Sequence, residues 1–201
     1  GSEMCIRDSI DTVSTLDFME NMKKFKINNN FAVAVSGGPD SLALMLLSNE
    51  FANHLDIKMT VICIDHNLRK NSSSEVKWVR SEAMKLGAHF ITAKIPKNNL
   101  KSNLMSYARD VRYKELYKIC SRKKIKVLLT AHHLDDEIEN FLMRLVRGSG
   151  IKGLSSLKEK SMVNNNKLQL IRPLLRYPKK SLIKYLSSKK QTYVCLSLIH
   201  I

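Results

Sequence analysis

The sequence predicts an α/β fold: a doubly wound parallel sheet of about five strands with helices on both faces. Short apolar runs of strand length alternate along the chain with longer segments of helical periodicity. The first two runs, Phe31–Ser36 and Met59–Asp65, are apolar almost throughout, as expected for parallel strands buried on both faces. The first run also leads through a Gly-Gly turn directly into a helix, a junction that suits phosphate binding.

Each element is predicted from its own pattern. Runs of strand length cover Phe31–Ser36, Met59–Asp65, His89–Ile95, Val127–Ala131 and Leu168–Ile171. Helical patterns cover Ser41–Ala52, Ser74–Gly87, Asn103–Cys120, Asp135–Arg147 and Tyr177–Ser188. The polar stretch Lys158–Lys167, rich in Lys and Asn, predicts an exposed loop.

The helix predicted over Asp135–Arg147 has the clearest periodicity. Apolar residues recur at i, i+3, i+4 and i+7, namely at Ile138, Phe141, Leu142 and Leu145. Gly148 follows directly, as a helix C-cap would. This spacing is typical of an amphipathic helix.

Composition limits the class of protein. No run approaches the roughly 20 apolar residues that span a bilayer, so we expect a soluble protein. The four cysteines are scattered without a CxxC pair, which favours neither a zinc site nor a disulfide framework and fits a reducing cytoplasm. The net charge of +16 favours an anionic partner such as RNA. However, 24 Lys against 10 Arg, with runs of Asn, is also what an AT-rich genome encodes on any surface.

The two ends break the α/β pattern. Gly1–Ser9 has no periodicity, and Val194–Ile201 is an apolar tail without a cap. Both resemble adapter-derived tails of translated metagenomic fragments. We therefore expect residues 1–9 and 194–201 to be non-native and the native gene product to be longer.

The turn after the first strand is the strongest functional signal. Its glycines allow close approach of the backbone, and successive N–H groups and a helix N-terminus point at one spot. Asp40 would meet a polyphosphate only through a divalent cation, so it is a candidate for Mg²⁺ or for a substrate ammonium. The alternative is that Asp40 or Ser41 merely caps the helix. The candidate ATP-binding residues here are Ser36, Gly37, Gly38, Pro39, Asp40 and Ser41.

Polar residues also follow the second predicted strand. Asp65 and His66 could frame adenine or ribose, and Arg69 could meet phosphate or RNA. The carboxyl ends of parallel strands share one edge of the sheet, so this loop would lie beside the first. An ordinary polar loop is the simpler alternative.

A third cluster follows the fourth predicted strand and opens a helix. Two adjacent histidines, His132 and His133, precede Asp135 and Asp136, which makes a dense set of ionisable groups. No three of these groups have the helical spacing of a zinc site. Mg²⁺ held by Asp40 and Asp136 fits better, because Mg²⁺ usually takes one or two carboxylates plus phosphate oxygens. Favourable capping of the helix by acidic residues is the alternative.

Two groups of basic residues complete the candidates. Arg109 and Arg112 share one helix face and could bind phosphate or carboxylate, although a surface ion pair is an equal alternative. Arg144, Arg147 and Lys152 belong to the stretch 144–154, in which basic side chains alternate with glycines, and are candidates for RNA contact, with a flexible linker as the alternative.

Ser-Gly-Gly-x-Asp-Ser resembles the PP-loop of the ATP pyrophosphatase superfamily, whose members cleave ATP between its α and β phosphates. The wider set of motifs resembles the N-terminal domain of the tRNA(Ile)-lysidine synthase family. The likeness runs from about residue 31 to 190, and the motifs that carry it are SGGPDS at 36–41, DHNLR at 65–69, ARDVRY at 108–113, TAHHLDDEIEN at 130–140, RLVRGSGIKGL at 144–154 and RPLL at 172–175. It implies a PP-loop catalytic domain over residues 10–190.

The resemblance implies a carbon–nitrogen ligase. That family activates the wobble cytidine of a CAU-anticodon tRNA(Ile) with ATP and Mg²⁺ as an adenylate, and L-lysine then displaces AMP. The implied roles are metal or lysine handling for Asp40 and Asp136, contact with the adenylate for His132, and contact with phosphate or the lysine carboxylate for Arg109 or Arg112.

Where the family continues into further tRNA-contacting domains, this chain enters its apolar tail, so we expect those domains to be absent. The alternatives are another PP-loop enzyme, for tRNA thiolation or as an amidotransferase synthetase, and a non-catalytic nucleotide-binding module. A thiolation enzyme would be expected to carry CxxC pairs, and this chain has none. The oligomeric state stays open, with a homodimer among the alternatives.

Overall fold

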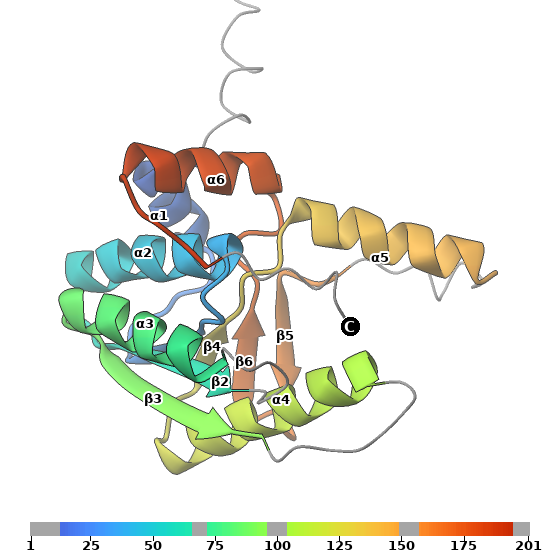
Figure 1. Ribbon diagram of the computed structural model, residues 1–201, viewed down its shortest axis with the longest axis horizontal. Helices are drawn as coiled ribbons and strands as arrows, with labels where there is room; N and C mark the ends of the chain where they lie inside the picture. Colours follow the sequence, from blue (N-terminus) through green and yellow to red (C-terminus); the bar gives the residue numbers. More distant parts are fainter. Residues whose placement is uncertain (1–12, 66–71, 96–103, 149–156, 195–201) are drawn as a thin grey trace, which may run out of the picture.

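The computed structural model of the chain describes residues 13–65, 72–95, 104–148 and 157–194. Its centre is a six-stranded sheet with the order β3-β2-β1-β4-β6-β5 (Figure 1). Neighbouring strands are parallel except β5, which pairs antiparallel with β6 at one edge. The strands are β1 (Phe31–Ala34), β2 (Met59–Asp65), β3 (His89–Lys94), β4 (Val127–Leu129), β5 (Lys160–Val163) and β6 (Leu168–Ile171).

Helices cover both faces of this sheet (Figure 1). Side chains alternate between the faces, so Phe31 and Val33 enter one hydrophobic core while Ala32 enters the other. The first core lies under α1, α2, α3 and α6, and the second lies under α4. The helices are α1 (Thr15–Lys23), α2 (Pro39–His54), α3 (Ser72–Lys85), α4 (Leu104–Arg122), α5 (Leu134–Val146) and α6 (Lys179–Ser188).

The predicted doubly wound α/β fold is confirmed. All five predicted strands form, and each predicted helix is present with its ends shifted by no more than a few residues. The structure adds α1, for which no prediction was made, with Ser14 as its N-cap. Among the described residues no helix is both long and apolar enough to cross a membrane.

The prediction of one exposed loop over Lys158–Lys167 was wrong in part. Lys160–Val163 forms β5, whose residues alternate between exposed and half-buried, and Asn164–Asn166 make the turn into β6 with positive φ angles. An edge strand buries only one face and needs few apolar residues, so its sequence looks polar.

Helix α5 differs from the other helices because it extends away from the sheet (Figure 1). None of its residues is buried, and Ile138 and Leu142 are each 51% exposed. The amphipathic pattern predicted for this helix is present, but its apolar face has no packing partner among the described residues.

The path of the chain creates one switch point. From β1 the chain moves outward through β2 to β3, then returns to β4 on the other side of β1. The loops that follow β1 and β4 therefore leave the carboxyl edge of the sheet side by side and in opposite directions. In open α/β sheets, ligands bind in the crevice at this position.

Candidate functional site

The loop after β1 is held in one shape by its own serines. The Val35 amide donates a hydrogen bond to the carbonyl oxygen of Ile62 (2.9 Å), which extends the pairing of β1 with β2. Ser41 Oγ then accepts a hydrogen bond from the Ser36 amide (3.2 Å) and donates one to the Gly38 carbonyl oxygen (3.0 Å). The loop is thus preorganised without a ligand.

The backbone conformation requires glycine at position 37 of this loop but not at position 38. Gly37 has a φ of +93°, and a Cβ built there would lie 3.1 Å from Cγ2 of Val79. Both the backbone angle and the space therefore require glycine at position 37. Gly38 is the N-cap of α2 at φ −70° and ψ 164°, an extended conformation open to any residue, and Pro39 follows as the first helical residue.

Asp40 lies in the first turn of α2 with its carboxylate turned toward α5. Its Oδ1 is buried and has no hydrogen-bond partner, and its Oδ2 lies 3.6 Å from Nε2 of His133. A buried carboxylate oxygen without a partner is costly, and a ligand at this position would remove the cost. The observation favours the binding interpretation of Asp40 over simple capping, because the N-cap of α2 is Gly38 and the buried Oδ1 of Asp40 accepts no hydrogen bond.

His133 joins the two helix starts. It is the N-cap of α5: its Nδ1 accepts from the Asp136 amide (3.3 Å), and its own amide donates to Asp136 Oδ2 (2.9 Å). Since Nδ1 accepts, the ring proton is on Nε2, which faces Asp40 Oδ2 and Asp136 Oδ2 at 3.6 Å each. Burial lowers the pKa of His133, but the hydrogen bond and charges from Asp40 and Asp136 outweigh it and raise the pKa above its ordinary value.

Asp40 and Asp136 therefore flank one buried imidazole. Two carboxylates, one with an unpartnered oxygen, fit Mg²⁺ when phosphate oxygens supply the remaining ligands. The described residues contain no cluster of three or more His, Cys, Asp or Glu side chains that could hold a metal by itself. The site thus suits a cation that arrives with a polyphosphate.

Asp135, the acid next to Asp136, has a different position. Its Oδ2 accepts a hydrogen bond from the amide of Lys179 (2.7 Å), the first residue of α6. The Leu134 amide donates to the Tyr177 carbonyl oxygen (3.0 Å) beside it. Asp135 thus ties the start of α5 to the start of α6.

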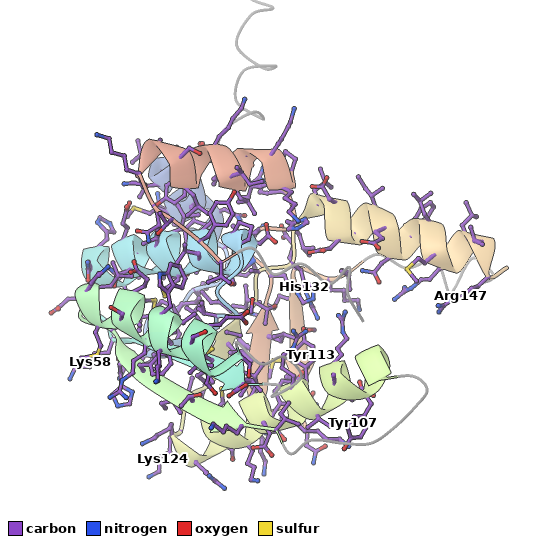
Figure 2. All side chains as sticks on the ribbon, in the orientation of Figure 1. Lys58, Tyr107, Tyr113, Lys124, His132 and Arg147 are labelled. Atoms are coloured by element: carbon purple, nitrogen blue, oxygen red, sulfur yellow. The ribbon has the colours of Figure 1, made fainter. Side chains whose placement is uncertain are left out.

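His132 faces α4 in the centre of the molecule, close to Tyr113 (Figure 2). Its Nε2 lies 3.3 Å from Nη2 of Arg109. A guanidinium nitrogen can only donate a hydrogen bond, so Nε2 of His132 is the acceptor. Its Nδ1 then carries the proton and donates to Thr130 Oγ1 (3.2 Å). Burial and the charges of Arg172 and Arg109 lower the pKa of His132 to about 3, so the ring is neutral at physiological pH.

Arginines concentrate positive charge around this neutral histidine. Burial lowers the pKa of Arg112 and of Arg172, although both keep their charge at physiological pH. Arg172 Nε is buried without a hydrogen-bond partner, while Nη1 of the same guanidinium donates a hydrogen bond to the Lys158 carbonyl oxygen (2.8 Å). A half-buried group of arginines with spare donors favours an anion such as a phosphate or carboxylate.

One cavity of about 570 Å³ lies among these groups, although Arg172, His133 and Asp135 are not among the residues that line it. Of the predicted residues, Ser36, Gly38, Pro39, Asp40, Ser41, Arg109, Arg112, His132 and Asp136 line it. Its wall also includes Lys179 and Tyr193 as well as an apolar surface from Ala34, Val35, Ile62, Ile64 and Leu116. The structure therefore brings residues from β1, β2, α2, α4, α5 and α6 to one place.

Sequence reasoning assigned no role to Lys179 and Tyr193, which line the cavity, or to Arg172, whose charge acts on His132. Arg172 had a signal, since it opens the RPLL motif, but no role was predicted for it. No sequence signal pointed to Lys179 or Tyr193. Each lies more than 40 residues after Asp136 and reaches the cavity only through the tertiary fold.

Other predicted residues do not reach the cavity wall. Asp65 is buried at the end of β2 and is not among the lining residues. Arg144 and Arg147 lie toward the outer end of α5, and Arg147 is far from His132 (Figure 2). The proposed roles of His66, Arg69 and Lys152 concern positions outside the described residues.

The end of the described chain returns to the loop between β1 and α2, residues 35–38, which we call the phosphate loop. The Val194 amide donates to the Gly37 carbonyl oxygen (3.1 Å), and Gln191 Nε2 donates to Glu82 Oε2 (2.8 Å). Val194 is the first residue of the tail expected to be non-native. The rest of that tail, residues 195–201, and the predicted N-terminal tail, residues 1–9, lie outside the described residues.

The cysteines offer no alternative chemistry in the described chain. Cys63 and Cys120 are both buried and unpaired, and burial raises the pKa of each thiol to about 12. A thiol with this pKa is not a nucleophile at neutral pH.

Fold and cavity together define a doubly wound α/β protein in which a Gly-Gly loop leads into a helix N-terminus at the switch point of the sheet. The PP-loop domain family matches residues 11–195, and the chain belongs to that family. Among solved structures, the U34-tRNA thiolase NcsA from Methanococcus maripaludis matches with a TM-score of 0.78 at 19% identity, covering 92% of this chain and 67% of that one. The NH3-dependent NAD synthetase from Campylobacter jejuni has a TM-score of 0.54 at 12% identity, over 88% of this chain and 70% of that one. These likenesses concern the fold.

Curated relatives are more similar in sequence. The tRNA(Ile)-lysidine synthase of Rickettsia bellii is 45% identical over 161 residues, which is 80% of this chain and 36% of that protein. The tRNA(Ile)-lysidine synthase of Rickettsia akari is 44% identical over 174 residues, or 82% of this chain and 40% of that protein. The chain thus spans about two fifths of the length of these relatives. The resemblance found from the motifs is confirmed.

Proposed function

We propose that this chain is the catalytic PP-loop part of an ATP-dependent tRNA-modifying ligase that joins L-lysine to the wobble cytidine of CAU-anticodon tRNA(Ile). The observation that carries the proposal is the meeting of four groups at one cavity: the phosphate loop, the Asp40–His133–Asp136 group, the arginines, and neutral His132. The similarity to lysidine synthases over four fifths of the chain supports the choice of substrate. The reaction would take place in the cytoplasm.

The loop and the apolar wall would bind ATP. The N–H groups of the preorganised loop and the start of α2 would hold the β and γ phosphates, since a helix N-terminus favours negative charge. The apolar surface made by Ile62, Ile64 and Leu116 suits the adenine ring. Mg²⁺, held by Asp40 and Asp136, would supply neutralisation of the phosphate charge.

Two chemical steps follow. In the first, the C2 oxygen of the cytidine bonds to the α-phosphorus of ATP and pyrophosphate leaves. In the second, the lysine ε-ammonium gives up one proton, the neutral amine bonds to C2, AMP leaves with that oxygen, and the nitrogen now bonded to C2 releases a further proton to solvent. Asp136 or Asp40 would accept the first proton, because a carboxylate that binds the ammonium is already in place.

Neutral His132 and the arginines would orient the reacting groups. With its proton fixed on Nδ1, His132 presents only an acceptor at Nε2, where Arg109 already donates. His132 therefore positions Arg109 toward the cavity rather than acting as a proton donor. Arg109 or Arg112 would bind the α-phosphate or the lysine carboxylate.

The test measures release of AMP and pyrophosphate from ATP with Mg²⁺ and CAU-anticodon tRNA(Ile), with and without lysine. We expect AMP formation that needs both tRNA and lysine, with lysine found on the tRNA. Asp40→Asn should reduce the rate at least about 100-fold because it removes the charge with little change of shape. Glu20→Gln, an exposed change on α1 outside the motifs, is the matched control and should leave the rate unchanged.

Two outcomes would contradict the proposal. ATP binding without any AMP formation would indicate a nucleotide-binding module. AMP formation that does not depend on lysine would indicate a different member of the PP-loop family.

A further inference from the structure

Helix α4 carries basic residues from the cavity to the opposite edge of the sheet. Arg109 and Arg112, in the first half of α4, line the cavity. Lys124 comes shortly after the last residue of α4 and lies on the far side of the molecule (Figure 2). With 19 residues at about 1.5 Å each, the helix is about 28 Å long. We name this surface the α4 track, and it consists of Arg109, Arg112, Lys114, Lys118, Arg122, Lys124 and Lys126.

Hollows in the surface follow the track in succession. Beyond the cavity, a shallow hollow of about 390 Å³ is lined by Lys114, Lys118, Arg122 and Tyr117. A third hollow of about 700 Å³ lies at the amino ends of β1, β4 and β6, and it contains Lys124 and Lys126. Ser121 and Asn164 line both of these hollows, so they are continuous.

The track is poorly neutralised. Lys114, Arg122, Lys124 and Lys126 form no ion pair with any residue that the structure describes, and all four are exposed. Lys118 pairs with Glu115 at 3.3 Å, and such exposed pairs contribute little. The third hollow has no carboxylate in its lining; it adds Lys26, Lys167 and asparagine amides. The surface therefore favours a polyanion over its whole length.

The residue types change along the track. Close to the cavity, the rings of Tyr113 and Tyr117 lie 5.8 Å apart beside the arginines, and aromatic rings beside arginine can stack on unpaired bases. Toward the far end the lining is lysine, asparagine and serine, which contact phosphate and sugar. The pattern fits an RNA whose unpaired bases lie at the cavity and whose base-paired part lies along α4.

We propose that the α4 track binds the sugar–phosphate backbone of a base-paired RNA stem whose adjoining loop enters the cavity. The inference rests on the proposed function, which supplies an RNA substrate, and it assigns the surface that holds the rest of that RNA. Base-paired RNA is recognised mostly through its shape and its phosphates, which a row of lysines can contact without reading sequence.

The test compares two triple variants of the full chain with equal loss of charge. K114A/R122A/K126A removes two lysines and one arginine from the track outside the cavity. K77A/R80A/K184A removes the same types of exposed charge from α3 and α6, on the other face of the sheet. Binding of CAU-anticodon tRNA(Ile) and of a second tRNA with another anticodon is measured at several salt concentrations. ATP affinity is measured in parallel to show that each variant is folded.

We expect the track variant to bind both tRNAs roughly 10- to 100-fold more weakly, with the slope of log affinity against log salt smaller by about 2 to 3. The control variant should keep nearly the full slope, and both variants should keep their ATP affinity. Equal losses in the two variants would overturn the proposal, because they would reflect net charge alone. If the unchanged chain binds both tRNAs equally and forms no lysine-dependent AMP, the proposed function fails, while the comparison of the two variants still decides the role of the track.

Discussion

Gly37 shows how a single backbone angle supports the whole site. At a φ of +93° an L-residue with a side chain is strained, and here the side chain would also press on Val79. The carbonyl oxygen of Gly37 additionally accepts the hydrogen bond from Val194. One residue thus sets the shape of the phosphate loop and anchors the last described segment.

We predict that Gly37→Ala lowers the free energy of unfolding by about 1 to 3 kcal/mol and weakens ATP binding at least about tenfold. The matched control is Gly87→Ala, because Gly87 also has a positive φ (+68°) but open space around the Cβ position. The control should lose about 1 kcal/mol and keep its ATP affinity. Chemical unfolding and calorimetric ATP titration check both effects, and a G37A variant with normal ATP affinity would contradict the proposed loop function.

His132 makes the free energy of unfolding depend on pH. Its pKa is lowered to about 3, mainly by burial, whereas the unfolded value is about 6.5. Between these values the unfolded chain binds a proton that the folded chain does not. The contribution of this group to stability is therefore complete above about pH 6.5 and is lost as the pH falls toward 3.

We predict that His132→Gln loses less free energy of unfolding than the unchanged chain when the pH falls from about 7 to about 4.5. Urea unfolding of both proteins at the two pH values measures the difference. The comparison between the proteins removes the contributions of groups that they share. Parallel pH dependences would show that His132 is protonated equally in the folded and unfolded states.

At the scale of elements, the start of α5 organises the site by holding two other helices. His133 faces Asp40 of α2, and Asp135 accepts the hydrogen bond from the first amide of α6. The remainder of α5 contributes no buried residue. The first turn of this helix therefore matters for the site far more than its amphipathic face.

We predict that Asp135→Ala destabilises the chain by about 0.5 to 2 kcal/mol, because the amide of Lys179 loses its partner at the N-terminus of α6. ATP affinity should change less than about threefold, since Asp135 does not line the cavity. Glu139→Ala on the exposed side of α5 serves as the control, with a change within about 0.5 kcal/mol. Unfolding curves and ATP titrations of the two variants decide, and an equal stability change in both would argue against the cap.

At the scale of the whole molecule, the sheet separates two cores that share its strands. Cys63 lies in the core under α2 and α3, and Cys120 lies in the core under α4. Both thiols are buried, and burial raises the pKa of each to about 12. Each cysteine therefore reports on the opening of one layer.

We predict that neither Cys63 nor Cys120 reacts with iodoacetamide at about pH 8 in the folded chain, and that both become reactive at the same urea concentration. Site-resolved mass spectrometry after short labelling pulses measures this. A common midpoint is expected because β1, β2 and β4 contribute side chains to both cores. Different midpoints would show that the α4 layer opens independently.

The strands, most helices and the phosphate loop were predictable because they depend on local signals. Continuous apolar runs such as Met59–Asp65 report burial on both faces, and the Gly-Gly turn reports a backbone angle that other residues avoid. The edge strand β5 was not predictable, since a half-buried strand of polar residues resembles a loop. The amphipathic pattern of α5 was read correctly, but its packing depends on neighbours that lie beyond the local sequence.

The sequence by itself determined the doubly wound fold, the phosphate loop and the positions of the carboxylates that face it, because hydrophobic periodicity and glycine geometry act over a few residues. Only the tertiary structure decided how these residues are used. It placed Arg109, from another helix, beside His132 and made that histidine neutral, and it separated Asp135, which caps α6, from Asp136, which faces the cavity. These outcomes depend on burial and on contacts between residues far apart in the chain, which no local pattern contains.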